Sequence, residues 1–328
     1  MKGGSINKSS CRVVGRGILG RICVVLVVLA SACVGLHAQD RETGKSKLPP
    51  PDFADVAYGT HERQVMDVWL APTKEPAPLL IYFHGGGFIT GRKENLPRSV
   101  LLACLKAGIS VASANYRFSP EVKFPAHYLD GARALQFARS QAAAWKIDPT
   151  RVALGGSSAG AATVLWIAFH DDMADPQSSD PVARQSTRVS CVVVAGAQPT
   201  YDRRVIRELA GEAAARHAVF ANLHGLSADE LDTPKAYELY TASAPLTHLT
   251  ADDPPVFAYY SEPRGKVEPT ARDGTGIHHP NLGLLLQQRM QALGIECVFR
   301  HKDEGADVNA ERIEFLRRHL GLAKGKGR

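Results

Sequence analysis

The sequence predicts a single α/β domain in which helices cover a mostly parallel, doubly wound sheet. Two observations support this prediction. From Val56 onward, short apolar runs alternate with longer helical stretches, which is the pattern of βα units. Several runs, such as Cys191-Val192-Val193-Val194, are consecutive apolar residues of the kind found in strands buried on both faces. The 328 residues, 45% of them hydrophobic, suffice for one sizeable core.

The predicted strands occupy residues 64–70, 79–83, 110–114, 152–154, 190–195, 256–260 and 296–300. The predicted helices occupy residues 96–107, 126–145, 281–293 and 308–320, with proline or glycine at several of their ends. Residues 202–247 interrupt the alternation with helical stretches near 205–220 and 234–243. We expect this insertion to lie over the strand ends, where open α/β sheets bind ligands. A purely structural excursion is the alternative.

Residues 1–38 have the composition of an export signal, with a basic start through Arg21, an apolar run over 22–36 and a small residue at Ala38. The run is short for a membrane span. We expect cleavage after Ala38, a linker over 39–51, a folded domain over 52–328 and a periplasmic or extracellular location without a membrane span in the mature chain. The alternatives are an uncleaved anchor helix and a lipoprotein, because Ala30-Ser31-Ala32-Cys33 resembles a lipobox with Cys33 as the lipidated residue.

The formal net charge of +6 comes mainly from this leader, whose five basic residues and no acids leave about +1 for the rest of the chain. No basic stripe with interleaved aromatic residues follows the leader, so we do not expect nucleic acid as a partner. Beyond the leader, Cys104, Cys191 and Cys297 are an odd and scattered set. They predict small buried hydrophobic residues, not a disulfide framework or a metal cluster.

The strongest local signal is a serine between two glycines at a predicted strand-to-helix junction. Gly156-Ser157-Ser158-Ala159-Gly160 follows the strand predicted over 152–154 and precedes a helical stretch over 161–169. This context is the one that a G-x-S-x-G nucleophile elbow requires. The elbow would expose the Ser158 hydroxyl above the sheet, at the positive end of the following helix.

The second signal is His84-Gly85-Gly86-Gly87-Phe88, directly after the strand predicted over 79–83. Consecutive glycines let the backbone turn its N–H groups toward a bound oxygen without a Cβ in the way. Such donors stabilise the oxyanion of an acyl-transfer intermediate. A flexible glycine-rich turn is the alternative, and the serine motif some seventy residues later argues against it.

The sequence resembles the hormone-sensitive-lipase-like branch of the α/β-hydrolases, which includes bacterial carboxylesterases and acetyl esterases. Besides the two motifs, the resemblance is carried by Asn115-Tyr116-Arg117, Asp148-Pro149-Thr150-Arg151-Val152 and Asp253-Pro254-Pro255-Val256. It implies an α/β-hydrolase fold with the insertion as a cap after the sixth strand. It further implies Ser158 as the nucleophile and the N–H groups of Gly86, Gly87 and Ala159 as the oxyanion hole.

The chain departs from the family at both remaining members of the triad, which in this fold follow the serine in the order acid, then histidine. Arg264 stands near the position of the family's aspartate, and the nearby carboxylates are Glu262, Glu268 and Asp273. Glu304 stands near the position of the family's histidine. The expected base is His301, with Glu262 as its partner, and His278-His279 is the alternative.

Two functions follow from these residues. The first is a serine carboxylesterase acting on small esters, such as acetylated carbohydrate, with Ser158, His301 and Glu262 as the triad and no cofactor or metal. The second is a ligand-binding protein that keeps the pocket but not the catalytic acid and base. A purely structural envelope protein ranks last, because it would need neither the serine nor the glycines. The oligomeric state does not follow from the sequence.

Overall fold

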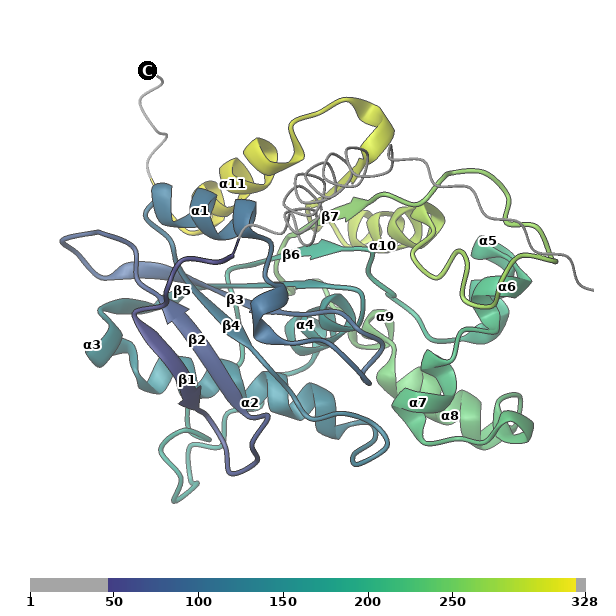
Figure 1. Ribbon diagram of the computed structural model, residues 1–328, viewed down its shortest axis with the longest axis horizontal. Helices are drawn as coiled ribbons and strands as arrows, with labels where there is room; N and C mark the ends of the chain where they lie inside the picture. The colour runs from purple at the N-terminus through teal and green to yellow at the C-terminus, as the bar shows by residue number, and fades with distance from the viewer. Residues whose placement is uncertain (1–46, 323–328) are drawn as a thin grey trace, which may run out of the picture. The chain divides into compact units, whose positions relative to one another are not determined.

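The computed structural model describes residues 47–322, which form an eight-stranded sheet with helices on both faces (Figure 1). The strand order is β1-β2-β4-β3-β5-β6-β7-β8. The six strands from β4 to β8 are parallel, and β2 and β1 add an antiparallel edge. The predicted mostly parallel α/β-hydrolase sheet is therefore confirmed. The strands are β1 (Phe53–Ala57), β2 (Val65–Trp69), β3 (Ala77–Phe83), β4 (Ser110–Ala114), β5 (Ile147–Ser157), β6 (Cys191–Ala195), β7 (Val256–Tyr260) and β8 (Cys297–His301).

The helices divide between the two faces of the sheet. Of the helices that cover the sheet, α1 (Arg98–Lys106) and α11 (Val308–His319) contact each other and contribute to one apolar cluster. The other cluster includes residues of α2 (Ala126–Ser140), α3 (Ala142–Trp145), α4 (Ala159–Phe169) and α10 (Pro280–Ala292). Between β6 and β7 lie α5 (Arg203–Ala210), α6 (Glu212–Ala215), α7 (Val219–His224), α8 (Pro234–Ser243) and α9 (Pro245–His248). This group is the helical insertion predicted after the sixth strand.

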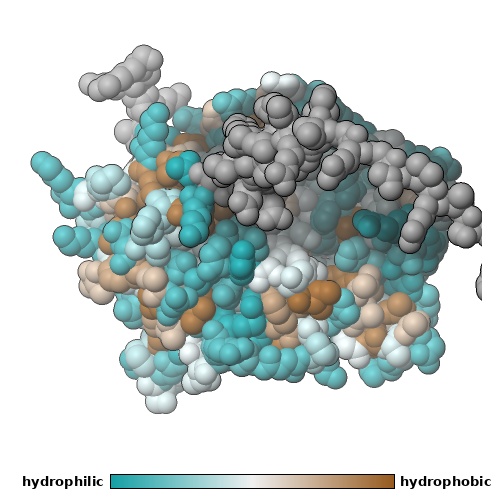
Figure 2. Space-filling model, in the orientation of Figure 1, coloured by the Kyte–Doolittle hydropathy of each residue, from teal (hydrophilic) through white to brown (hydrophobic). Residues whose placement is uncertain are grey.

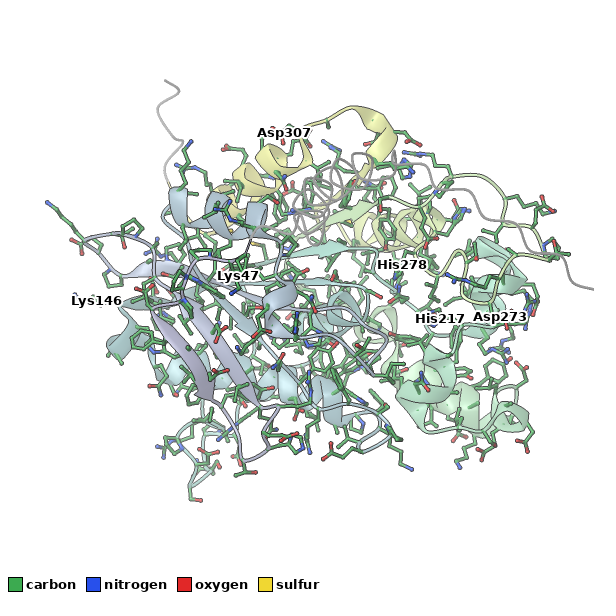
Figure 3. The ribbon with its side chains drawn as sticks, in the orientation of Figure 1. Lys47, Lys146, His217, Asp273, His278 and Asp307 are labelled. Carbon is green, nitrogen blue, oxygen red and sulfur yellow. The ribbon has the colours of Figure 1, made fainter. Side chains whose placement is uncertain are left out.

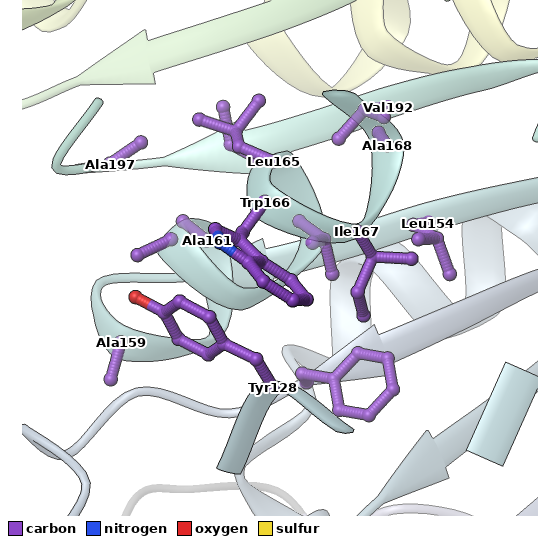
Figure 4. Close-up of a cluster of buried hydrophobic side chains, with 14 of the residues drawn as sticks. Tyr128, Leu154, Ala159, Ala161, Leu165, Trp166, Ile167, Ala168, Val192 and Ala197 are labelled. Atoms are coloured by element: carbon purple, nitrogen blue, oxygen red, sulfur yellow. The ribbon is translucent and has the colours of Figure 1, made fainter. Parts of the chain in front are cut away.

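The continuous apolar runs are explained by burial on both faces of the sheet. Leu79, Ile81 and Phe83 of β3 belong to the cluster that contains α2 and α4, whereas Leu80 and Tyr82 belong to the cluster under α1 and α11. Successive strand residues point to opposite faces, so both sets must be apolar. Figure 4 shows α4 within the first cluster, where each of its eleven residues is buried. The helix that follows Ser158 is thus fixed along its whole length.

Some elements differ from the prediction. β1 was not predicted, because it is a short edge strand with little burial and no apolar alternation. The helix predicted over 126–145 ends at Ser140 and restarts as α3. The stretch predicted over 205–220 is divided at Gly211, where a backbone φ of +94° is incompatible with a continuing helix.

The predicted export signal lies outside the described residues, as does most of the linker. Between residues 47 and 322, no helix combines the length and apolar character needed to cross a bilayer. On the face shown in Figure 2, polar residues are mixed with small apolar areas. Cys104, Cys191 and Cys297 are buried, as predicted, and carry free thiols.

Candidate active site

Ser158 lies in a sharp turn between β5 and α4. Its φ of 50° and ψ of −119° are strained for a residue with a side chain. The turn is held by a hydrogen bond from the Ser158 amide to the carbonyl oxygen of Ala195, at 2.9 Å. The flanking glycine is needed for space, because a Cβ on Gly160 would lie 2.1 Å from the Phe83 carbonyl oxygen. The local geometry is that of the predicted elbow.

The glycine loop after β3 lies directly against this turn. A Cβ on Gly85 would come within 3.1 Å of the Ser158 Cβ, whereas a Cβ on Gly87 would meet no atom within 4 Å. Gly87 has a φ of +59°, which glycine adopts readily. Within the described residues, no carbonyl accepts a hydrogen bond from the Gly86 or Gly87 amide. The Ala159 amide is in the first turn of α4 and has no partner within the helix. The three amides are therefore available to a ligand.

His84 lies at the start of this loop and holds it in place. Its side chain is fully buried, so it does not face a ligand. Its Nδ1 lies 2.8 Å from the Gly85 carbonyl oxygen and therefore carries the hydrogen. Its ring stacks on Tyr116 at 4.5 Å between centroids, and the Tyr116 hydroxyl donates to the His84 carbonyl oxygen at 2.9 Å. Burial lowers the pKa of His84 to about 4, so the ring is neutral at pH 7.

The histidine beside Ser158 is His278, in the segment between β7 and α10. Its Nε2 lies 2.8 Å from the Ser158 Oγ, and its Nδ1 lies 3.1 Å from Oε1 of Glu262 (Figure 3 labels His278). A carboxylate only accepts hydrogen bonds, so Nδ1 carries the hydrogen and Nε2 is free to accept from the serine hydroxyl. About a third of the His278 side chain and 28% of the Glu262 side chain are exposed. The three side chains thus form a continuous, solvent-accessible hydrogen-bonded line.

His301, the histidine expected beside Ser158, does not reach it, and His278 lies there instead. The His301 side chain is fully buried, and its Nε2 lies 2.7 Å from the backbone carbonyl oxygen of Glu262. Because that carbonyl can only accept, Nε2 carries a hydrogen and is unable to take one from a serine. Nδ1 faces Asp303, accepting from its amide at 3.3 Å. His301 instead anchors the backbone of Glu262.

The predicted carboxylate, Glu262, is at the site, but its partner is His278. Of the other candidates, Asp273 pairs with Arg216 at 2.6 Å. Glu268 takes part through its backbone, because its carbonyl oxygen accepts a hydrogen bond from the Ala271 amide at 2.9 Å. The two residues that replace the family's acid and histidine, Arg264 and Glu304, form an ion pair with each other at 2.6 Å. The two departures from the family pattern are therefore spatial neighbours.

Two residues fix the backbone around His278, and a third leaves room for its ring. Gln198 donates from Nε2 to the carbonyl oxygens of Gly196 and Ile277, at 2.9 and 3.0 Å. His279 caps the start of α10 by accepting from the Asn281 amide, and its Nε2 lies 3.1 Å from the Gly265 carbonyl oxygen. Gly196 leaves room for the imidazole, because a Cβ there would lie 3.1 Å from the His278 Cδ2.

Replacing Gly196 by alanine is expected to lower kcat at least about tenfold, because the added methyl group displaces the His278 ring and small displacements of reacting groups are costly. Gly196 has a φ of +58°, so the variant also loses about 1 kcal/mol of stability. The matched control is Gly294→Ala, where φ is +74° and no atom lies within 4 Å of the new Cβ. It should lose the stability alone. Esterase kinetics and thermal unfolding check both variants, and an unchanged kcat in Gly196→Ala would contradict the expectation.

Within residues 47–322, no group of three or more His, Cys, Asp or Glu side chains is placed to hold a metal ion. The fold and the Ser158–His278–Glu262 arrangement define an α/β-hydrolase. The chain belongs to the BD-FAE family, whose model matches residues 66–269.

The chain is also similar to curated and structurally solved hydrolases. The probable carboxylic ester hydrolase LipM of Mycobacterium tuberculosis is 26% identical over 70% of this chain and 54% of its own length. The chain spans about half the length of the curated relatives of this kind that it matches. A solved acetyl ester-xyloside bifunctional hydrolase from Caldicellulosiruptor lactoaceticus covers 86% of this chain and all of its own, with a TM-score of 0.65 and 20% identity. A truncated carbohydrate esterase from gut microbiota covers 83% of this chain and 99% of its own, with a TM-score of 0.63 and 18% identity. The two structures share the fold.

Proposed function

We propose that the protein is a serine hydrolase of carboxylic esters, with Ser158 as nucleophile, His278 as base and Glu262 as the acid that orients it. The observation that carries the proposal is the hydrogen-bonded line from Ser158 Oγ through His278 to Glu262, at 2.8 and 3.1 Å. A serine hydroxyl is a weak nucleophile at its own pKa and needs an adjacent base that a third group holds in orientation. In this line His278 is the adjacent base and Glu262 is the group that orients it.

The proposed reaction begins when Ser158 Oγ attacks the ester carbonyl carbon while its proton passes to His278 Nε2. The carbonyl oxygen becomes an oxyanion that accepts hydrogen bonds from the Gly86, Gly87 and Ala159 amides, and Glu262 stabilises the imidazolium. Collapse of the intermediate breaks the bond to the alcohol oxygen, which takes the proton from His278. Water then repeats the sequence on the acyl-enzyme, releases the carboxylic acid and returns the proton to Ser158.

The proposed substrates are small esters, including acetylated carbohydrate. The support is the solvent-accessible triad and the structural similarity to a carbohydrate esterase and to an acetyl ester-xyloside bifunctional hydrolase. The other candidate, a ligand-binding protein without hydrolysis, was motivated by the altered acid and histidine positions. Because Glu262 and His278 can take the roles of the altered acid and histidine, no observation favours this candidate.

A fluorophosphonate probe is expected to label the wild-type protein at Ser158, because only an activated serine reacts with it. Ser158→Ala should be unlabelled, whereas the neighbouring Ser157→Ala should label like the wild type. Mass spectrometry of the labelled peptide locates the residue. An unlabelled wild type, or turnover of p-nitrophenyl acetate that survives in Ser158→Ala, would refute the proposal.

The proposal includes export directed by residues 1–38, with a periplasmic or extracellular site of action. Amino-terminal sequencing of the exported protein tests it. A start at residue 39 supports signal cleavage, a lipidated start at Cys33 supports the lipoprotein alternative, and a start upstream of Cys33 overturns both.

A further inference from the structure

Glu262 and His278 both come from the segment that joins β7 to α10, residues 261–279, which contains no helix or strand. On the side of the sheet, His301 and Gln198 bind one backbone carbonyl near each end of the segment, those of Glu262 and Ile277. The residues between these two anchors have no partner strand. Ordering each residue of an irregular segment costs about 1–2 kcal/mol of conformational entropy, so its middle needs further contacts.

The helical insertion supplies those contacts. Arg216, which follows α6, donates from Nε to Oδ1 of Asp273 at 2.6 Å and from Nη2 to the Pro269 carbonyl oxygen at 3.2 Å. The same Nη2 lies 3.5 Å from the Ala271 carbonyl oxygen. The Gly274 amide donates to the Ala213 carbonyl oxygen of α6 at 2.7 Å. In Figure 1 the segment passes α5 and α6 before it enters α10.

The packing around these bonds is close. A Cβ on Gly274 would lie 2.6 Å from Cδ2 of His217, and a Cβ on Gly276 would lie 2.8 Å from the Ala210 carbonyl oxygen (Figure 3 labels His217 and Asp273). The first residues of α10 are held as well, because Asn281 donates from Nδ2 to the Leu209 carbonyl oxygen at 2.8 Å. The segment with the acid and the base is thus fitted to the insertion as closely as to the sheet.

We infer that Arg216 is a positioning residue, through which the helical insertion holds the segment so that Glu262 and His278 face Ser158. The insertion then positions catalytic side chains, in addition to lying over the strand ends. A guanidinium suits this role, because its fixed fork binds a carboxylate and backbone carbonyls at the same time. The inference rests on the proposed function.

Because Arg216 and Asp273 are partly exposed, their effect on catalysis can be measured apart from an effect on folding. The side chains of Arg216 and Asp273 are 33% and 66% exposed, and ion pairs at such positions contribute about 0–1 kcal/mol to stability. Their loss should therefore leave the protein folded while the segment loosens. Displacement of a reacting group by about 1 Å can lower a rate about 100-fold.

The test compares Arg216→Ala with Arg204→Ala. Arg204 lies in α5, is 65% exposed and also pairs with an aspartate at 2.6 Å, but that partner is Asp202 at the start of the same helix. For each variant we measure the rate of fluorophosphonate labelling, kcat and KM for p-nitrophenyl acetate, and the unfolding temperature. Arg216→Ala is expected to lower kcat and the labelling rate at least about tenfold. KM should stay within about twofold of the wild type, because Arg216 does not touch the serine. Arg204→Ala should leave all four values unchanged.

Two further variants test the guanidinium of Arg216 and its partner Asp273. Arg216→Lys, which keeps a cation but not the fork, should restore part of the lost rate. Asp273→Ala removes one of the three contacts that Arg216 makes with the segment. It replaces Arg216→Ala as the test should that variant fail to fold, and it should lower kcat with little change in KM. Equal rates in Arg216→Ala and Arg204→Ala, with a labelled wild type, would overturn the inference alone. An unlabelled wild type would instead overturn the proposed function.

Discussion

Replacing His278 by alanine is expected to lower kcat for p-nitrophenyl acetate by about 10⁴–10⁶-fold, the range over which loss of a triad member acts in other serine hydrolases. Its Nε2 is the ring nitrogen that faces the Ser158 hydroxyl, at 2.8 Å, and it is free to accept a proton. The remaining rate would come from the oxyanion hole and substrate binding. Steady-state kinetics and the rate of fluorophosphonate labelling measure the effect.

The contrasting variant is His301→Gln. Glutamine keeps an N–H donor for the Glu262 carbonyl oxygen, which His301 binds at 2.7 Å, so we expect less than about a tenfold loss. His301→Ala removes that donor from a fully buried position and should cost stability, about 1–3 kcal/mol, as well as rate. An inactive His301→Gln together with an active His278→Ala would restore the assignment made from the sequence and contradict the present one.

Replacing Lys93 by methionine is expected to destabilise the fold by about 3–5 kcal/mol, because it leaves the buried carboxylate of Asp67 without its partner. The Lys93 Nζ lies 2.9 Å from Asp67, 3.0 Å from Asp55 and 2.9 Å from Glu94. Only 7% of the Lys93 side chain and 8% of the Asp67 side chain are exposed. Burial alone would lower the pKa of Lys93, but the three carboxylates outweigh it and raise the pKa. Denaturant unfolding measures the loss.

Two control variants test whether the stability lost in Lys93→Met comes from an unpaired buried charge. Lys93→Met combined with Asp67→Leu removes both buried charges and should recover much of the stability, since apolar residues of similar volume often replace buried ion pairs without loss. Arg318→Ala breaks an exposed pair with Glu296 at 2.6 Å and should cost less than about 1 kcal/mol. Equal stability of Lys93→Met and the wild type would show that the network does not hold the edge of the sheet.

The choice of His301 from the sequence followed the position of the family's histidine after the eighth strand. His301 is at the end of β8, as expected, but it is directed at the backbone of Glu262. The positions where the family has its acid and histidine hold Arg264 and Glu304, which neutralise each other as an ion pair. Position in the family pattern was thus a good guide to which loops meet and a poor guide to which imidazole faces the serine.

The sequence by itself determined the sheet, the elbow at Ser158 and the glycine loop. These features depend on local patterns in the chain, such as the continuous apolar runs of buried strands, the small residues around a sharp turn and the placement of proline and glycine at helix ends. Glu262 was named from the sequence because it lies close to the position of the family's acid after the seventh strand, and the structure places it 3.1 Å from His278.

Only the tertiary structure decided that His278 is the histidine at the site. His278 lies 120 residues from Ser158 in the sequence, and its position depends on Gly196, Gln198 and the contacts of the 261–279 segment with the insertion. No local pattern encodes those contacts, because an irregular segment has no periodicity and takes its course from the surfaces on which it packs. The imidazole that reaches the serine is therefore selected by packing between distant parts of the chain.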